Sequence, residues 1–261
     1  MIVETHGPVL RRLLATVIIS LCAATAANAQ IRKESDVHAR LAQEPLRVFL
    51  ARGGENACGK GCSTWIAVDG QFDKGSAERL GAFVRGLEMQ DLPVFLNSMG
   101  GLTDEGIEVG RFLRNNKMRA GVGSSRADCV SLRASNCTAL MAAAQPVPAT
   151  WSSNATCSSA CVFALLGAPA RLVPDGVKIG IHSTAYFCFR EDGRVMRPVG
   201  KSEDALDCKK QLQERAEQLT NYIAEMSISK DLIRAMDAIP SSRIRFLSRD
   251  EIKRYRIATT E

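Results

Sequence analysis

The chain has 261 residues, of which 46% are hydrophobic, and this apolar content is sufficient to bury the core of a globular domain. Its formal net charge is +6, but the lysines and arginines are interspersed with aspartates and glutamates and form no long basic run. Aromatic residues make up only 5% of the chain. Composition and charge therefore argue against a nucleic-acid-binding surface.

The N-terminal segment 1–29 has the pattern of a cleaved secretory signal. Arg11 and Arg12 precede an apolar stretch, 13–24, that is shorter than the roughly 20 apolar residues of a membrane-spanning helix. The sequence Ala-Asn-Ala at 27–29 provides small residues at the two positions that a signal peptidase reads. We therefore expect cleavage after Ala29 and a periplasmic or secreted bacterial protein.

Strand and helix patterns alternate along the rest of the chain. The charged segment 30–45 lacks periodicity and is expected to be an N-terminal arm. Short apolar or alternating runs predict strands at 46–50, 64–68, 93–96, 119–122 and 177–181. Helical spacing predicts helices at 76–87, from 103 onward, at 158–166 and at 205–226. Alternating units of this kind are typical of an α/β fold, which we place in one domain, 46–258.

The segment 124–155 interrupts this alternation. It is rich in serine, alanine, proline and asparagine and carries Cys129 and Cys137. An irregular segment of this length is uncommon in a compact domain unless it is functional or held by a cross-link. We therefore expect an insertion that a Cys129–Cys137 disulfide clips together.

The cysteines favour disulfides over a metal site. Removing segment 1–29 takes away Cys22 and leaves 9 − 1 = 8 cysteines, an even number, as expected for a disulfide-bonded exported protein. Two Cys-x3-Cys pairs resemble ligand pairs, but zinc sites usually have tighter spacing or nearby histidines, and the mature chain has only His38 and His182. We expect no metal and no cofactor.

Three bridges are expected between cysteines that are close in sequence across glycine-rich or polar loops. They are Cys58–Cys62, Cys129–Cys137 and Cys188–Cys208. The remaining two, Cys157 and Cys161, flank Ser159 four residues apart, and disulfide geometry fits them poorly if both are helical. We expect these two side chains to pack without a bridge.

Four segments resemble one known family in the order in which that family carries them. They are 94–101 (VFLNSMGG), 157–166 (CSSACVFALL), 178–182 (KIGIH) and 245–248 (RFLS). The first is similar to a strand ending in Asn-Ser-Pro-Gly-Gly, the second to a nucleophile helix, the third to a strand ending in histidine, and the fourth to a late Arg-Phe-Leu-Ser. The family is the Clp protease proteolytic subunit within the Clp/crotonase superfamily, particularly its exported bacterial members. The resemblance implies a single-domain spiral of repeated strand–helix units.

The resemblance also assigns roles to individual residues. It implies that Ser159 is the nucleophile, that His182 is the general base, and that the backbone N–H groups of Gly101 and Ala160, beside Gly100, form an oxyanion hole. The residue types suit these roles, because N–H groups exposed at a helix start favour a developing oxyanion and glycines let a backbone approach a carbonyl closely. Alone, Ser159 would be read as a helix cap and His182 as a structural residue. Together they favour an active site.

One family feature is missing. The family has a triad aspartate immediately before the Arg-Phe-Leu-Ser segment, and this chain has Ile244 there. Isoleucine cannot accept a hydrogen bond from the histidine or stabilise an imidazolium. Asp231, Asp237 and Asp250 are near in sequence, but none falls at the matching position. Either the site is a Ser–His dyad, another group orients the histidine, or hydrolysis has been lost.

We expect an exported, ATP-independent serine hydrolase, a peptidase, whose substrate is a peptide or protein. No ATPase partner is expected, because an exported chain meets no ATP, and self-association is left open. Two alternatives remain. The first is a catalytically inactive Clp-like binding or scaffold protein. The second is a crotonase-type acyl-thioester enzyme, which also uses a backbone oxyanion hole but needs no Ser–His pair.

Overall fold

A computed structural model of the chain describes residues 44–89, 91–129, 134–186, 188–189, 195–196 and 201–259. All of them belong to one compact unit, 41–261. The expected signal segment 1–29, and all but the last two residues of the expected arm 30–45, lie outside the described residues.

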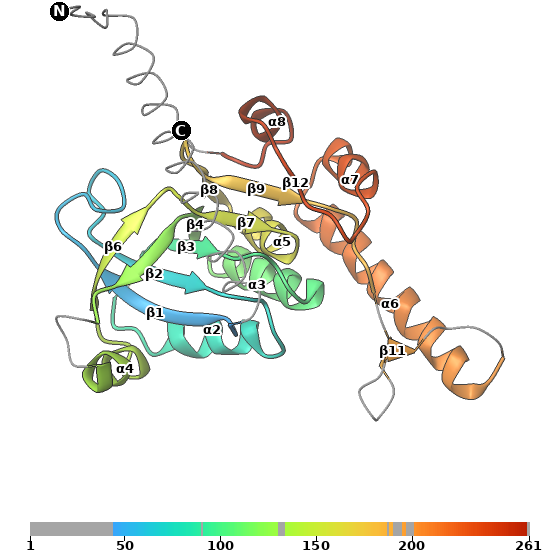
Figure 1. The fold of residues 1–261 in the computed structure, drawn as a ribbon, viewed down its shortest axis with the longest axis horizontal. Helices are drawn as coiled ribbons and strands as arrows, with labels where there is room; N and C mark the ends of the chain where they lie inside the picture. The colour runs from blue at the N-terminus through green and yellow to red at the C-terminus, as the bar shows by residue number, and fades with distance from the viewer. Residues whose placement is uncertain are drawn as a thin grey trace, which may run out of the picture. The chain divides into compact units, whose positions relative to one another are not determined.

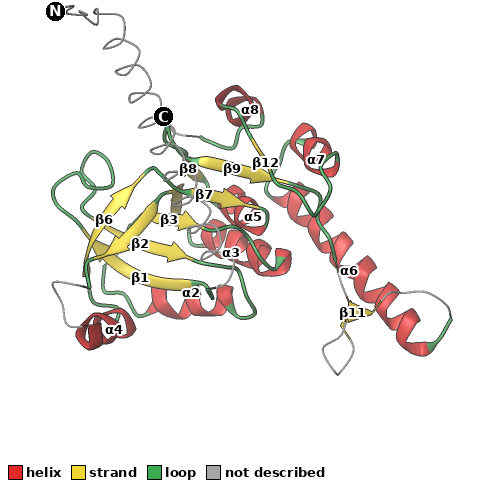
Figure 2. Cartoon of the chain, viewed as in Figure 1, coloured by secondary structure: helices red, strands yellow, loops and turns green. Residues whose placement is uncertain are grey.

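The main sheet has seven strands in the order β5-β6-β1-β2-β3-β4-β8 (Figures 1 and 2). Their bounds are β1 Arg47–Arg52, β2 Thr64–Asp69, β3 Val94–Asn97, β4 Arg119–Val122, β5 Ser124–Ala127, β6 Val147–Ser152 and β8 Ala170–Leu172. Strands β2, β3, β4 and β8 run parallel to one another, and β1 pairs antiparallel with β2. Every residue of β3 is buried, as expected for a central strand of a parallel sheet.

A three-stranded sheet, β12-β9-β7, continues from the carboxyl end of β3. It contains β7 (Thr156–Ser158), β9 (Lys178–Ile181) and β12 (Arg245–Phe246). Strands β7 and β9 are parallel, and β12 is antiparallel to β9. A parallel bridge between Ser98 and Cys157 joins this sheet to the chain that leaves β3. A separate pair is formed by β10 (Cys188–Phe189) and β11 (Val195–Met196).

Seven helices complete the described part of the chain. They are α2 (Ser76–Arg85), α3 (Thr103–Asn115), α4 (Ala134–Ala142), α5 (Ala160–Gly167), α6 (Glu203–Glu225), α7 (Lys230–Asp237) and α8 (Arg249–Arg254). Every residue of α5 is buried, so this helix is apolar all round and lies in the core. Within the described ranges, no helix is long and apolar enough to cross a membrane.

Helices α3 and α5 touch backbone to backbone. A Cβ atom on Gly106 of α3 would lie 2.3 Å from the carbonyl oxygen of Ala160, and one on Gly167 of α5 would lie 2.2 Å from the carbonyl oxygen of Gly110. Both distances are far shorter than any real Cβ contact, so neither position accepts a side chain without displacing a helix. The contact brings α3 directly against the residue that begins α5.

The α/β architecture expected from the sequence is confirmed, and the predicted strands and helices agree with the observed ones to within a few residues. The segment 124–155, expected as an insertion, contributes β5 and β6 to the edge of the main sheet, with α4 between them. One contact that fixes this edge is the hydrogen bond from Trp65 Nε1 to Ser125 Oγ, at 2.8 Å.

The three predicted disulfides are confirmed: Cys58–Cys62, Cys129–Cys137 and Cys188–Cys208. The prediction that Cys157 and Cys161 are unbridged is wrong, because they too form a disulfide. The prediction holds only if both residues are helical, whereas Cys157 lies in β7 and only Cys161 lies in α5. The sharp turn at Ser159 sets their Cα atoms 5.2 Å apart, which suits a disulfide.

The glycine contact between α3 and α5 can be tested by substitution. In an ordinary helix, Gly→Ala raises stability by about 0.5–1 kcal/mol. We expect Gly106→Ala to lower the free energy of unfolding instead, by about 1–3 kcal/mol, because its Cβ meets the Ala160 carbonyl. Gly54→Ala is the matched control, since nothing lies within 4 Å of its Cβ position. Urea unfolding measures both, and equal midpoints would contradict the backbone contact.

Candidate functional site

Three parallel strands end side by side, and each is followed by one of the motifs that the sequence singled out. The N–H of Ser98, just after β3, donates to Thr156 O at 2.8 Å, and the N–H of Ser158 donates back to Ser98 O at 3.0 Å. The N–H of Ser159 then donates to Gly180 O in β9, at 3.0 Å. Carboxyl ends of adjacent parallel strands are where α/β proteins commonly bind ligands.

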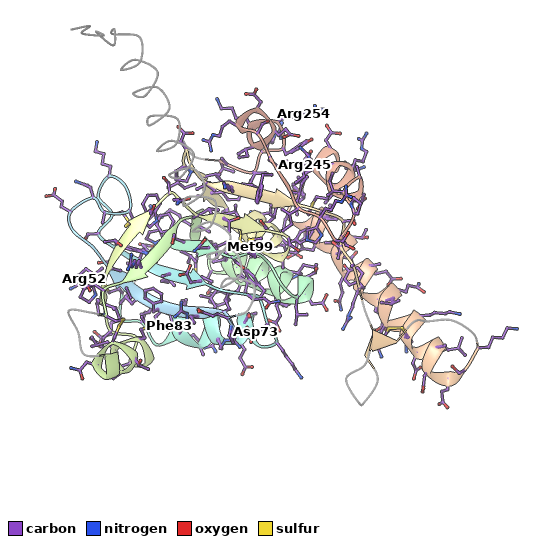
Figure 3. All side chains as sticks on the ribbon, in the orientation of Figure 1. Arg52, Asp73, Phe83, Met99, Arg245 and Arg254 are labelled. Carbon is purple, nitrogen blue, oxygen red and sulfur yellow. A yellow bond between two sulfur atoms is a disulfide. The ribbon has the colours of Figure 1, made fainter. Side chains whose placement is uncertain are left out.

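The predicted residues therefore occupy one region. The glycine pair 100–101 follows β3, Ser159 follows β7, and His182 follows β9. Met99, which precedes the glycine pair, lies near the middle of the described structure (Figure 3). The strand order brings the backbones together. Within the described residues, however, no hydrogen bond links the Ser159 hydroxyl to the imidazole of His182.

Ser159 has an unusual backbone conformation. Its φ is 55° and its ψ is −122°, which lies outside the helical, extended and left-handed helical regions open to ordinary residues. Strand β7 ends one residue before it and α5 begins one residue after it. Ser158 and Ala160 are both 0% exposed, whereas Ser159 is partly exposed. The turn therefore presents Ser159 between two residues that solvent cannot reach.

The backbones of three glycines pack closely against this turn. A Cβ on Gly100 would lie 2.6 Å from Ser159 Cβ and 3.2 Å from its Oγ. A Cβ on Gly180 would lie 2.2 Å from Ser158 Oγ, and one on Gly106 would lie 2.3 Å from Ala160 O. The turn formed by residues 158–160 is thus enclosed by backbone from three other segments. We call these residues the serine turn.

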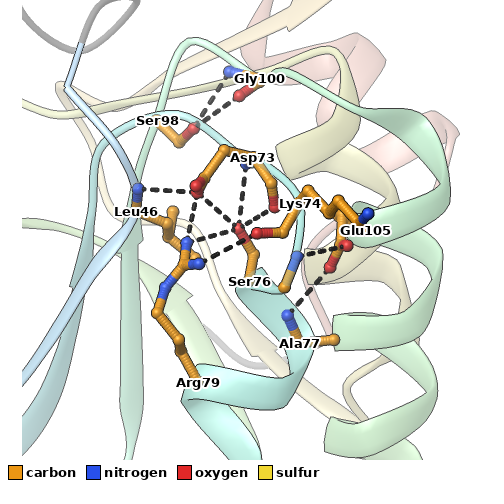
Figure 4. Close-up of polar contacts among 10 residues, drawn as sticks. Leu46, Asp73, Lys74, Ser76, Ala77, Arg79, Ser98, Gly100 and Glu105 are labelled. Atoms are coloured by element: carbon orange, nitrogen blue, oxygen red, sulfur yellow. Dashed lines mark hydrogen bonds and ion pairs between the residues drawn. The ribbon is translucent and has the colours of Figure 1, made fainter. Parts of the chain in front are cut away.

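The backbone N–H groups near Ser159 differ in what they contact. The N–H of Gly100 donates to Ser98 Oγ at 3.0 Å, as Figure 4 shows. The loop is also tied to Phe72, whose N–H donates to Gly100 O at 2.8 Å and whose carbonyl accepts from Leu102 N–H at 2.7 Å. Among the described residues, the N–H groups of Gly101 and Ala160 donate no hydrogen bond. Within the described residues those two N–H groups are therefore unoccupied, whereas that of Gly100 is occupied.

The imidazole of His182 is held by a backbone carbonyl. Its Nδ1 lies 2.8 Å from Ser183 O. A carbonyl oxygen only accepts hydrogen bonds, so this contact requires a proton on Nδ1, and in the neutral form of the ring Nε2 is then the acceptor. The Ser183 N–H donates to Ile239 O at 2.8 Å, which fixes the peptide that follows the ring. A neutral imidazole with a free Nε2 is the form of a general base.

Ile244 occupies the place opposite His182. Strand β12 pairs antiparallel with β9, with Arg245 opposite Ile181, so the next pair in this register is Ile244 and His182. Ile244 is 37% exposed, and its Cγ2 would be 2.6 Å from a Cβ on Gly180. In this register the residue next to the histidine, just before β12, is therefore apolar.

Two charged residues that precede or follow Ile244 in the sequence pair with other charged groups. Arg245, labelled in Figure 3, donates to Glu251 at 2.8 Å. Asp231, one of the carboxylates considered from the sequence, pairs with Arg234 at 3.0 Å. In the part of the chain that the structure describes, no group of three or more histidine, cysteine, aspartate or glutamate residues is arranged to hold a metal ion.

A polar network supports the segment that carries Phe72 (Figure 4). The carboxylate of Glu105 in α3 accepts the N–H groups of Gly75 and Ala77 at 2.7 and 3.0 Å, and so caps α2 from a neighbouring helix. Asp73 accepts the Leu46 N–H at 3.2 Å and also contacts Arg79.

Burial acts to raise the pKa of Asp73. The hydrogen bonds from the Leu46 N–H, Arg79 and Ser76 outweigh burial and leave the pKa below its usual value. The network therefore favours a charged carboxylate at the start of α2, where the helix dipole also favours negative charge.

Sequence reasoning missed the groups that act through their backbone. The Ser183 carbonyl acts through its backbone, as does Phe72, which holds the glycine loop by two backbone hydrogen bonds. The type of residue at these positions therefore gives no indication of the role. Gly180 and Gly106 did give an indication, since a glycine inside a strand or helix often marks close backbone approach. The Cys157–Cys161 bridge was missed because the turn at Ser159 was read as helix.

No protein-family model matches the chain, and no curated protein sequence matches it. Among solved structures, a mutant of ClpP1 from Listeria monocytogenes is similar at 17% identity and a TM-score of 0.42, covering 72% of this chain and 84% of that one. A mutant of the membrane-bound stomatin-specific protease 1510-N is similar at 11% identity and a TM-score of 0.41, covering 72% and 73%. At such scores and identities, the likeness establishes neither a family nor an activity for this chain.

Proposed function

We propose that the chain is an exported, ATP-independent serine hydrolase that cleaves peptides, with Ser159 as nucleophile and His182 as general base. The observation that carries the proposal is the backbone conformation of Ser159, with φ 55° and ψ −122°. A non-glycine residue in such a region costs about 1–3 kcal/mol and persists only where the surroundings impose it. A strained strand-to-helix turn is one way in which hydrolases present a serine hydroxyl to substrate.

The chemistry follows from the groups around this turn. Ser159 Oγ attacks the substrate carbonyl carbon while His182 Nε2 takes the hydroxyl proton, and the same imidazole returns the proton to the leaving amine. Water then attacks the acyl-serine with the histidine again acting as base. The hydroxyl–imidazole hydrogen bond that this requires forms in the substrate complex, because such bonds are often long or misaligned in free enzymes.

Two N–H groups are proposed as the oxyanion hole. Those of Gly101 and Ala160 donate to no described residue; the first lies in the glycine loop after β3 and the second lies in the serine turn itself. The Ala160 N–H also lies at the start of α5, where the helix dipole favours negative charge. The N–H of Gly100 is bonded to Ser98 and is therefore not proposed as an oxyanion donor. The contribution of Gly100 is that its backbone packs closely against Ser159.

The Ser183 carbonyl takes over part of the role of the missing aspartate. It holds the Nδ1 proton and so sets the tautomer that catalysis requires. A neutral carbonyl stabilises the imidazolium less than a carboxylate would, and the proposed enzyme is therefore slow. The site is a Ser–His dyad whose base is oriented by backbone.

Substrate and compartment are proposed from the surroundings of the site. Leu102, which follows the glycine pair, is 49% exposed, and Phe246, two residues after Ile244, is 40% exposed. We propose that these apolar side chains contact residues near the cleaved bond of a peptide substrate. Four disulfides within the described residues fit a protein that matures in an oxidising compartment.

A fluorophosphonate probe tests the nucleophile directly, because it reacts covalently with an activated serine. We expect the wild type to be labelled and Ser159→Ala to lose labelling completely. His182→Ala is expected to lower the labelling rate about 100-fold or more, which is the usual contribution of a general base. The rate of probe incorporation, followed by in-gel fluorescence, measures all three.

Ser158→Ala is the matched control, since this neighbouring hydroxyl is 0% exposed and should not reach the probe. It should label like the wild type. If Ser159→Ala is still labelled, the reactive residue is not Ser159. A wild type that neither labels nor cleaves a peptide library overturns the hydrolase and favours the binding-protein alternative.

The absent acid can be restored. Ile244→Asp places a carboxylate opposite His182, where it can accept the Nδ1 proton and stabilise the imidazolium, so we expect faster labelling and faster peptide cleavage. The control is Ile244→Asn, because asparagine has nearly the same shape as aspartate but no charge. Its labelling and cleavage rates should rise less than those of Ile244→Asp. A rate for Ile244→Asp at or below that of Ile244→Asn would show that the register does not bring position 244 to the imidazole.

A further inference from the structure

A disulfide spans the proposed nucleophile. Cys157 lies in β7, two residues before Ser159, and Cys161 lies in the first turn of α5, two residues after it. Both cysteines are 0% exposed. The other three bridges join cysteines that lie elsewhere in the sequence, so this one alone of the four encloses a residue of the proposed site.

The bridge limits the conformations open to the enclosed residues. An extended chain would separate residues 157 and 161 by about 13 Å at about 3.3 Å per residue. The bonded cysteines have their Cα atoms 5.2 Å apart, so the bond excludes extended backbone through Ser159. A continuous helix is also disfavoured, since two cysteines four residues apart on a helix fit disulfide geometry poorly. A sharp turn between a strand and a helix satisfies the bond.

The backbone of Ser159 itself makes two hydrogen bonds within the described residues. Ser159 donates its N–H to Gly180 O at 3.0 Å and accepts from Val162 N–H at 2.9 Å through its carbonyl. These two bonds and the enclosing glycines oppose the cost of a positive φ at a serine. A covalent tie across the same five residues adds a constraint that does not depend on the neighbouring strands.

We propose that the Cys157–Cys161 disulfide is a positioning element that holds Ser159 in its reactive conformation, so that the site becomes active only once this bridge has formed. The inference rests on the proposed serine hydrolase. It makes the two cysteines positioning residues, since neither sulfur is exposed to a substrate.

The bridge forms by thiol–disulfide exchange with an external disulfide oxidant such as oxidised glutathione. The two cysteine thiols lose two electrons and two protons as the S–S bond forms, and the oxidant's disulfide is cleaved to two thiols. Because both sulfurs are buried in the folded chain, exchange takes place before the core closes. Activity is therefore acquired during oxidative folding.

The first test is the double variant Cys157→Ala/Cys161→Ala, assayed as the mature protein with the fluorophosphonate probe. We expect the maximal rate of covalent labelling to fall about 10-fold or more while the probe concentration at half-maximal rate stays the same, because positioning and not binding is lost. The matched control is Cys129→Ala/Cys137→Ala. Cys157 and Cys161 belong to one cluster of buried apolar residues, whereas Cys137 belongs to a second cluster against which Cys129 packs. Loss of the Cys129–Cys137 bridge should therefore change the labelling rate by less than about two-fold.

A second measurement uses the wild type, in case the double variant fails to fold. Reduced, unfolded wild type is refolded with oxidised glutathione, and samples are labelled with a biotin-linked fluorophosphonate and captured. Their free thiols are then alkylated under denaturing conditions and mapped by mass spectrometry. We expect captured chains to be at least about 10-fold depleted in alkylated Cys157 and Cys161 relative to uncaptured chains.

The outcomes separate this inference from the proposed function. A labelled wild type together with an equally fast double variant, or captured chains that carry alkylated Cys157, overturns the positioning role and leaves the hydrolase intact. A wild type that is never labelled overturns both. An equal loss in the Cys129/Cys137 control would show a general effect of destabilisation and would also overturn the positioning role.

Discussion

The serine turn depends on backbone segments that approach it more closely than any side chain would allow. Gly100 meets Ser159, Gly180 meets Ser158, and Gly106 meets Ala160, each at a distance where a Cβ would overlap its neighbour. Because of these contacts, β3, β7, β9 and α3 converge on three residues. The core helix α5, the join between the two sheets and the position of Ser159 all follow from that convergence.

The same contacts explain how a strained serine is retained. Its conformation costs free energy that close packing and the Cys157–Cys161 bond offset. The opposite face of the glycine loop is supported by Phe72, and the start of the adjacent helix is capped by Glu105. The loop bearing the proposed oxyanion donor is thus fixed from one side and the serine from the other, as a preorganised site requires.

Much of the fold followed from the sequence, because buried strands such as 94–97 and the apolar helix 160–167 have unambiguous patterns. The order of the strands in the sheets could not be predicted, since a short apolar run does not indicate which other strand it pairs with. The polar composition of segment 124–155 predicts an insertion and hides two edge strands. Ser159 and His182 were identified by residue type and motif, whereas the Ser183 carbonyl and the Cys157–Cys161 bridge depend on backbone geometry that composition does not report.

The central claim is that Ser159 is a nucleophile facing an oxyanion hole made by the N–H groups of Gly101 and Ala160. A crystal structure of the mature protein after reaction with a peptide-like phosphonate tests it most directly. The account predicts a covalent bond to Ser159 Oγ, a positive φ at that residue, and a phosphonyl oxygen about 2.7–3.1 Å from both N–H groups. A phosphonate bound to another residue, or an oxygen turned away from both donors, would contradict it.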